Sequence, residues 1–306
     1  MKITIIGAGN VGGTTAMRLA QEGVGDIFLI DIAGGLAAGK ALDLEDARAI
    51  LKLNYSVTGS NDINDLKDSD IIVVTAGLAR KPGMTREDLA NKNAAILKDI
   101  SLKISALAKQ AIVIIVTNPL DLMTYFAHKT IGFNPKKIFG MGVSLDASRF
   151  ANLISKELKV SPVDVEACVI GSHGQDMIPL PRFTNIKGVG LDEFLKDDKI
   201  KELTKRTVER GAEIVGLLGS GSAYYAPSAA IAHLVRAVAK DEKRTIGVSA
   251  YLDGEYGIKD ACVGVPCRLG RNGIEEIIKL DLNQDELEKL NQSASNLKAQ
   301  FNQITL

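Results

Sequence analysis

Hydrophobic residues in the first half of the chain form short runs that are separated by longer amphipathic stretches. The strands that this pattern predicts lie at residues 2–6, 27–30, 55–58, 71–74, 111–116 and 137–139. Apolar runs bounded by turn residues are typical of strands that are buried on both faces of a parallel sheet. The amphipathic stretches predict helices that end near residues 22, 50 and 108. Because strands and helices alternate, the sequence predicts a parallel, doubly wound α/β sheet.

The second half of the chain orders its elements differently. It predicts a helix from residue 144, a strand from residue 165, helices near 199–218 and 227–239, strands at 245–252 and 261–269, and a helix at 284–301. Strands that are grouped together before a terminal helix favour an α+β lobe over a continuation of the parallel sheet. We therefore expect two domains, residues 1–142 and residues 143–306.

Composition narrows the class of protein. The chain has 306 residues, of which 46% are hydrophobic and 24% charged, and its formal net charge is zero. This balance gives no support to a nucleic-acid or membrane-surface role, and no apolar run approaches the length of a membrane span. The predicted first strand begins at Lys2, so no signal peptide is expected. Cys168, Cys262 and Cys267 lack metal-type spacing, which favours reduced, buried thiols in a cytoplasmic protein without a metal site.

A glycine-rich turn follows the first predicted strand. Gly7-Ala8-Gly9-Asn10-Val11-Gly12 matches the G-x-G-x-x-G pattern between a strand and a helix, which is typical of dinucleotide binding. Gly7 would permit the tight turn, Gly9 would let backbone amides approach a pyrophosphate, and Gly12 would let the helix pack closely on the strand. The second strand ends in Asp31, whose carboxylate would accept hydrogen bonds from a ribose. Since only uncharged residues follow it directly, NAD is favoured over NADP.

A basic loop connects the strand at 71–74 to the next helix. It carries Arg80, Lys81 and Arg86, and its glycines and proline break both helix and strand patterns. Loops at the carboxyl ends of parallel strands are where open α/β sheets bind ligands. Two arginines in such a loop could close over a small anion with two carboxylates. Taken alone, the stretch also fits a solvated surface loop.

Further polar residues stand where strands end or helices begin. Asn118 follows the strand at 111–116 and precedes a proline, so it could bridge a cofactor and a substrate or make an Asx-Pro turn. Asp146 and Arg149 share a helix face, where they could simply form an intrahelical ion pair. His173 lies between two glycines at a strand end, which fits an acid–base catalyst or an ordinary turn histidine.

In their order along nearly the whole chain, these motifs resemble the lactate/malate dehydrogenase superfamily. The matching segments are GAGNVG (7–12), the acid at 31, TAGLARKPGMTREDL (75–89), VTNPLD (116–121), LDASR (145–149), GSHG (171–174) and GSAYYAP (221–227). Within that superfamily, the chain looks most like the lactate-dehydrogenase-like malate dehydrogenases. The resemblance implies an NAD-binding Rossmann domain over residues 1–142 and an α+β catalytic and substrate domain over residues 143–306. It also implies NAD-dependent oxidation of (S)-malate to oxaloacetate in the tricarboxylic acid cycle, by a homodimer or homotetramer.

The resemblance assigns catalytic or substrate-binding roles to five residues. His173 would exchange a proton with the C2 oxygen of the substrate, and Asp146 would orient His173 and stabilise its protonated form. Arg149 would grip the C1 carboxylate in a two-pronged contact. Arg86 would polarise the C2 carbonyl, and Arg80 would bind the second carboxylate of the dicarboxylate substrate.

The resemblance also assigns the cofactor site. NAD would lie on the Gly7–Gly12 turn and at Asp31, and it would contact Val116 and Asn118 at the end of a strand. Asn118 would contact the substrate as well. Asn93 would reach the cofactor from the long helix that follows the basic loop.

Arg80 separates this prediction from its nearest alternative, a lactate or other 2-hydroxyacid dehydrogenase of the same fold. In the family's lactate enzymes this position is typically an uncharged Gln. Pyruvate beside Arg80 would leave the guanidinium desolvated and unpaired, which costs about 3–5 kcal/mol. A non-catalytic NAD-sensing protein is an alternative of a different class, but it is not expected to keep the catalytic residues. Two departures from the family pattern, at residues 142–146 and at Gln175, leave every catalytic group in place.

Overall fold

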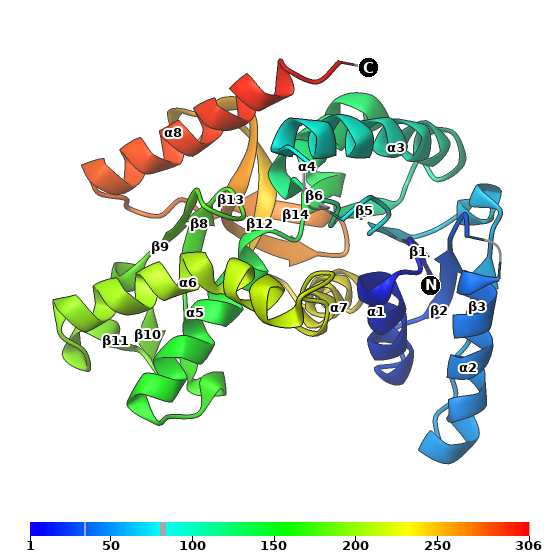
Figure 1. Ribbon diagram of the computed structural model, residues 1–306, viewed down its shortest axis with the longest axis horizontal. Helices are drawn as coiled ribbons and strands as arrows, with labels where there is room; N and C mark the ends of the chain where they lie inside the picture. The colour runs from blue at the N-terminus through cyan, green and yellow to red at the C-terminus, as the bar shows by residue number, and fades with distance from the viewer. Residues whose placement is uncertain (34, 80–83, 306) are drawn as a thin grey trace.

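One mixed sheet runs through the protein, and helices cover both of its faces (Figure 1). The computed structural model describes residues 1–33, 35–79 and 84–305, and for Arg86 the backbone only. In the view of Figure 1, two helices lie above the sheet, α3 (Arg86–Leu107) and α4 (Leu120–Ile131). Two others lie below it, α1 (Asn10–Gln21) and α7 (Tyr225–Ala239).

The first six strands form a parallel sheet. They are β1 (Lys2–Ile6), β2 (Asp26–Ile30), β3 (Val57–Ser60), β4 (Ile71–Val74), β5 (Ile112–Ile115) and β6 (Ile138–Gly140). Their order across the sheet is β3-β2-β1-β4-β5-β6, and every neighbouring pair is parallel. The helix α2 (Leu36–Leu51) connects β2 to β3. The predicted doubly wound sheet is confirmed, and its strand order reverses between β1 and β4, the kind of position where such sheets bind ligands.

Successive residues of these strands point into different cores, as the pleat of a strand requires. In β4, Ile71 and Val73 join the core that contains residues of α1 and α7. Ile72 and Val74 join the core that contains residues of α3 and α4. Both faces of the strand are buried, which is why its apolar run in the sequence is uninterrupted.

The second half of the chain adds antiparallel strands to the same sheet. Besides α7, its elements are α5 (Val143–Leu158), β7 (Val165–Glu166), β8 (Val169–Gly171), β9 (Met177–Pro179), β10 (Asn185–Ile186), β11 (Val189–Gly190), α6 (Asp197–Leu218), β12 (Arg244–Asp253), β13 (Lys259–Gly270), β14 (Gly273–Ile277) and α8 (Gln284–Phe301). The long strands β12 and β13 pair with each other, and β12 joins β6 where Ser249 pairs with Gly140. The result is an 11-stranded sheet, while β7, β10 and β11 form a small sheet of their own.

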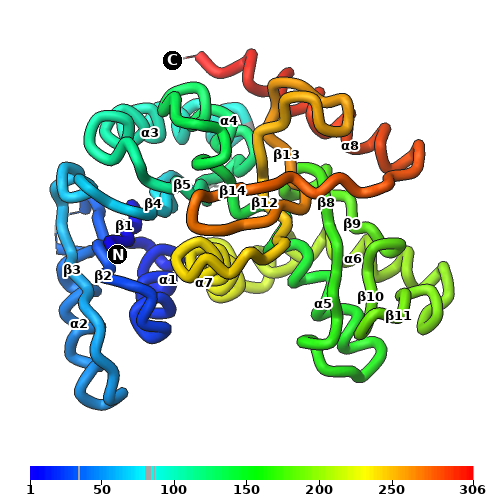
Figure 2. Tube along the Cα trace, turned by 180° about the vertical axis from the view of Figure 1, so that it is seen from behind, coloured from blue at the N-terminus to red at the C-terminus, as the bar shows by residue number. Residues whose placement is uncertain are grey.

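The junction between β6 and β12 differs from the expected separate lobe. The grouped strands are present, as predicted, but they pair antiparallel and extend the first sheet instead of standing apart from it. Without β12, the outer edge of β6 would present unpaired backbone groups. Figure 2 shows the two halves on this shared sheet, with the C-terminal end of α8 passing over α4.

No bounds are predicted for α4 from the sequence, although the residues around His128 follow a helical pattern. All of its residues from 120 to 127 are buried, so no exposed polar face marks this stretch as a surface helix. The helix begins directly after Pro119 and ends at Gly132, which adopts a left-handed conformation with φ of 72°. Its first turn supports the site described below.

The cysteines follow the expected pattern with one difference. Cys262 and Cys267 are buried, whereas Cys168 is partly exposed, and all three are free. Burial raises the pKa of each thiol, that of Cys168 to about 12, so the thiol form is favoured over the thiolate. Within the part of the chain that the structure describes, no helix combines the length and apolar character that crossing a membrane demands.

Candidate active site

The glycine-rich turn joins β1 to α1 at the point where the strand order reverses. Gly7 has φ of +108°, a conformation that residues with a Cβ rarely adopt. A Cβ on Gly12 would collide with the carbonyl oxygen of Gly7, so α1 packs directly against the turn. By contrast, apart from the chain neighbours of Gly9, no atom of the described residues lies within 4 Å of the position of a Cβ on Gly9. The turn thus leaves space at the N-terminus of α1, where backbone N–H groups and the helix dipole suit a pyrophosphate.

Asp31 supports this turn through its carboxylate. Its Oδ2 accepts a hydrogen bond from the backbone N–H of Ala8 at 2.6 Å, and its Oδ1 accepts one from Ala33 at 2.8 Å. Lys40 of α2 also supports the turn, since its Nζ donates hydrogen bonds to the carbonyl oxygens of Ala8 and Gly9 at 2.7 and 3.0 Å. Sequence reasoning missed Lys40, since a lysine in a surface helix carries no local signal.

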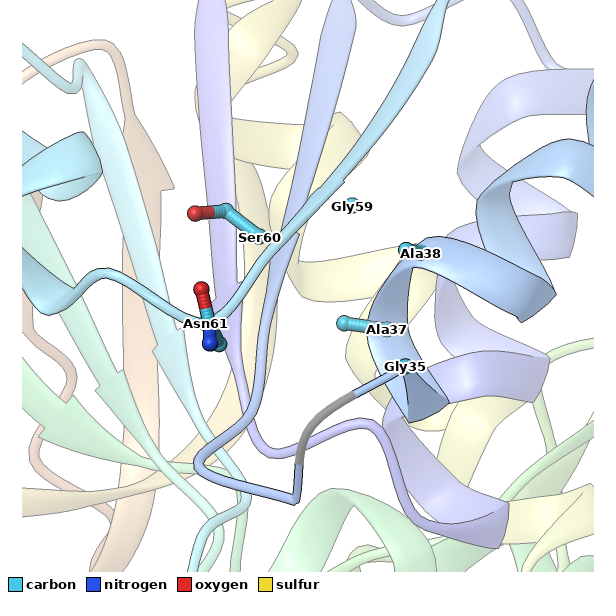
Figure 3. Close-up of a pocket in the computed structure, with 6 residues that line it drawn as sticks. All are labelled: Gly35, Ala37, Ala38, Gly59, Ser60 and Asn61. Carbon is cyan, nitrogen blue, oxygen red and sulfur yellow. The ribbon is translucent and has the colours of Figure 1, made fainter.

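A cavity of about 320 Å³ lies at the start of α2, beside the segment that follows Asp31 (Figure 3). Small residues from α2 and from the end of β3 line it: Gly35, Ala37, Ala38, Gly59, Ser60 and Asn61. In Figure 3 the Ala37 and Ala38 side chains of α2 lie across from the end of β3. The cavity therefore adjoins the position predicted for the ribose of a dinucleotide.

Asn93 joins the two loops that follow β4 and β5. Its side chain is fully buried, and its Oδ1 accepts a hydrogen bond from the backbone N–H of Leu78 at 2.7 Å. Its Nδ2 donates to the carbonyl oxygens of Leu78 and Asn118 at 3.2 and 2.6 Å. The amide predicted to reach the cofactor is thus engaged with the protein backbone, an arrangement that the helical pattern around Asn93 did not reveal.

A larger cleft lies between helices of the first half of the chain and helices of the second half. It has a volume of about 860 Å³ and is lined by residues of both halves, among them Val11, Val116, Asn118, Arg149, His173 and Gly211. Val11 belongs to the glycine-rich turn itself, and Asn118 is exposed just after the end of β5. The cleft therefore connects the dinucleotide turn to the polar residues that the sequence singled out in the second half.

His173 and Asp146 form a hydrogen-bonded pair in this cleft. The Nδ1 of His173 lies 2.7 Å from Oδ2 of Asp146, whose side chain is fully buried. Burial alone would lower the pKa of His173, but the charge and hydrogen bond of Asp146 outweigh it, and the charge of Asp121 adds to them. The pKa of His173 is therefore raised, which favours its protonated form. Because Asp146 engages Nδ1, the other ring nitrogen remains for a ligand.

Arg149 stands beside this pair on the same helix, α5. Its Nη1 donates to Oδ1 of Asp146 at 3.2 Å, so the intrahelical ion pair considered from the sequence is present. The side chain is only 11% exposed, and its buried Nε makes no hydrogen bond within the described residues. Burial lowers the pKa of Arg149, and the charge of Asp146 opposes this shift. A desolvated guanidinium at the wall of a cleft is well suited to hold a carboxylate.

The basic loop lies partly outside the described residues. The predicted contacts of Arg80 and of the Arg86 side chain lie outside the described part of the chain, which leaves out the segment 80–83 and includes only the backbone of Arg86. The predicted helix start at residue 86 is confirmed, since Thr85 and Asp88 form a capping box at the first turn of α3.

Comparison with known proteins agrees with this geometry. Residues 1–140 match the model of the lactate/malate dehydrogenase NAD binding domain, and residues 143–305 match the model of the lactate/malate dehydrogenase alpha/beta C-terminal domain. A malate dehydrogenase of Methanosarcina acetivorans is 52% identical over 97% of this chain and 97% of its own. The malate dehydrogenase of Staphylococcus epidermidis is 48% identical, covering 96% of this chain and 94% of its own.

Solved structures give the same result. The apo malate dehydrogenase of Picrophilus torridus superposes with a TM-score of 0.95 at 42% identity, covering 98% of this chain and 96% of its own. A lactate dehydrogenase of Eimeria maxima with NADH and oxamate superposes with a TM-score of 0.94 at 36% identity, covering 97% and 92%. The predicted fold class, family and NAD dependence are confirmed. This chain belongs to the lactate/malate dehydrogenase family.

Proposed function

We propose that this protein catalyses the reversible, NAD-dependent oxidation of (S)-malate to oxaloacetate. The observation that carries the proposal is the His173–Asp146 pair with Arg149 beside it, in a cleft that reaches the glycine turn. Full-length relatives that are 45–52% identical bear the name malate dehydrogenase, which supports this choice of substrate.

His173 and Asp146 carry out the proton transfer that accompanies hydride transfer. When bound, NADH supplies a hydride to the C2 carbon of oxaloacetate. His173 donates a proton to the C2 oxygen through Nε2, since Nδ1 is held by Asp146. Asp146 fixes the tautomer and the orientation of the ring and stabilises the imidazolium, as in other His–Asp pairs. In the oxidation of malate, the neutral His173 takes the same proton back.

The arginines account for the charges of the substrate. Arg149 binds the C1 carboxylate, because a planar guanidinium can donate two parallel hydrogen bonds to it. By family resemblance, Arg86 polarises the C2 carbonyl and stabilises the negative charge that develops on its oxygen. Arg80 binds the second carboxylate and so selects a dicarboxylate over pyruvate.

The cofactor would be held by the glycine turn and its supports. The space above Gly9 and the N-terminus of α1 suit the pyrophosphate, and Asp31 suits a ribose without a 2′-phosphate. Val116 and Asn118 line the cleft between this turn and His173, where the nicotinamide would have to lie to meet the substrate. We propose that Asn93 supports cofactor binding indirectly, by holding the loops after β4 and β5 in position.

Initial rates of NADH oxidation test the proposal. With oxaloacetate we expect rapid turnover, and with pyruvate a rate lower on the order of a hundredfold or more, because Arg80 would be left unpaired. NADPH in place of NADH should support little turnover, because Asp31 repels a 2′-phosphate. Equal or higher rates with pyruvate would instead favour a lactate or other 2-hydroxyacid dehydrogenase.

We also propose that the protein is a cytoplasmic homodimer or homotetramer with a role in the tricarboxylic acid cycle. In each subunit, the boundary between the two domains would lie between residues 142 and 143. The three free cysteines suit a reducing compartment. Exposed apolar side chains such as Leu42, Ile50 and Leu217 suit subunit contacts. Light scattering coupled to gel filtration would measure the mass of the particle, and a mass near 32.6 kDa would contradict the assembly.

A further inference from the structure

Asp121 is a buried carboxylate that the sequence left without a role. It lies in the first turn of α4 and is 4% exposed. Its Oδ2 accepts a hydrogen bond from the backbone N–H of His173 at 2.7 Å. This contact joins α4 of the first half to the turn that carries the histidine in the second half.

The turn at His173 is held from three helices. Asp146 of α5 holds the imidazole, and Asp121 of α4 holds the backbone N–H of the same residue. Ser293 of α8 accepts a hydrogen bond from the backbone N–H of Ser172 at 2.9 Å, and the hydroxyls of Ser172 and Ser293 lie 2.8 Å apart. Of these holding groups, Asp121 and Asp146 carry charge.

Asp121 is more deeply desolvated than a side chain that only accepts a hydrogen bond needs to be. Its Oδ1 is buried and has no partner at full hydrogen-bond geometry within the described residues, although the buried hydroxyl of Ser249 lies close enough to favour the ionised carboxylate. An amide or hydroxyl could accept the same N–H without the desolvation cost of a charge. A carboxylate at this position is therefore explained better by its charge than by its hydrogen bond.

We propose that Asp121 is a positioning residue of the reaction, which fixes the backbone of His173 and places a second negative charge beside its imidazole. This inference rests on the proposed role of His173 as the acid–base catalyst. Through that charge, Asp121 helps His173 to keep its proton until hydride transfer makes the C2 oxygen basic.

Among the described residues, the charged groups that act on His173 come from the helices α4 and α5. Asp146 and Asp121 raise the pKa of His173, while burial and the charge of Arg149 lower it. Burial raises the pKa of Asp121 to about 6, opposed by Ser249 and His173, so the carboxylate is mostly ionised at neutral pH. Cys262 of β13 lies near Asp121, but burial raises the pKa of this thiol well above its usual value and keeps it neutral.

The test compares pH profiles of kcat/KM for oxaloacetate reduction. Asp121→Asn keeps an oxygen for the His173 N–H and removes the charge. Reduction needs protonated His173, so kcat/KM falls as pH rises through the pKa of His173. In the variant this alkaline limb should move to lower pH by up to about one unit, with up to about tenfold loss on the alkaline side and unchanged NADH affinity. Asp121→Ser, also uncharged, should move the limb in the same direction.

Glu286→Gln is the matched control. Glu286 is also a buried carboxylate, but it binds Arg182 and the backbone of Asn283, away from the histidine. Its neutralisation should leave the limb where it is. An alkaline limb at the wild-type position in whichever Asp121 variant folds, judged by NADH binding, would overturn the inference. A wild-type protein without activity toward oxaloacetate would instead overturn the proposed function.

Discussion

His173 and Asp146 are 27 positions apart in the chain, yet Nδ1 of the histidine lies 2.7 Å from Oδ2 of the aspartate. The first comes from the turn after β8 and the second from α5, which pack together in the second half of the protein. Burial of Asp146 makes the contact consequential, because a charge without water around it acts strongly on its neighbour. The pair is therefore the first place to test the chemistry.

Replacing Asp146 by Asn should lower kcat for oxaloacetate reduction by about 10²–10⁴-fold, because the tautomer of His173 is no longer fixed. The charge and hydrogen bond of Asp146 raise the pKa of His173, so its loss should also move the alkaline limb of the reduction profile to lower pH. Stopped-flow and steady-state rates across pH would measure both effects. Asp260→Asn removes a carboxylate that binds Tyr125 and Lys129, away from His173, and should change neither.

Two glycines of the same turn should respond differently to alanine. Gly12→Ala should lower the free energy of unfolding by about 1–3 kcal/mol or more, because the new Cβ meets the Gly7 carbonyl. Gly9→Ala should leave stability nearly unchanged, since the new Cβ meets no atom of the described residues beyond its chain neighbours, but it should weaken NADH binding. Denaturant unfolding and fluorescence titration would separate the effects. Unchanged NADH affinity in Gly9→Ala would mean that the pyrophosphate lies elsewhere.

Asn93→Ala should destabilise the protein by about 1–3 kcal/mol, because backbone groups of Leu78 and Asn118 lose buried partners. NADH affinity should fall with it as the two loops lose their mutual position. Ser105→Ala, on the same helix, removes one hydrogen bond to the carbonyl of Ile131 and serves as control. A variant with normal stability and sharply weaker NADH binding would favour direct contact between Asn93 and the cofactor.

Arg80→Gln should move the substrate preference from oxaloacetate toward pyruvate on the order of a hundredfold or more, because the unpaired guanidinium is removed and the dicarboxylate loses its partner. The ratio of kcat/KM for the two substrates is the measurement. Lys81→Gln removes the neighbouring positive charge of the same loop and should leave that ratio near its wild-type value. Retained preference for oxaloacetate in Arg80→Gln would assign selectivity to another residue.

Several features of this protein follow from residues that act close to their own positions in the chain. Uninterrupted apolar runs predicted buried parallel strands, and the parallel strand order and the cores on the two faces of the sheet confirm them. The glycine pattern before a helix and Asp31 at the next strand end predicted a dinucleotide turn, because each of those residues acts within a few residues of its own position. Motif resemblance marked His173, Asp146 and Arg149, which the structure places in contact or side by side.

Which polar groups meet across long separations in the chain depends on how the helices and strands pack. Asp121 accepts a hydrogen bond from the backbone of His173, the amide of Asn93 binds the backbone of two loops, and Lys40 donates to the glycine turn. No local sequence pattern predicts these three contacts. The pairing of β12 with β6 and the burial of α4 likewise depend on which elements lie beside them. The sequence specifies the type of each side chain. The helices and strands that pack around a side chain determine its burial, and burial in turn affects its charge and its partners.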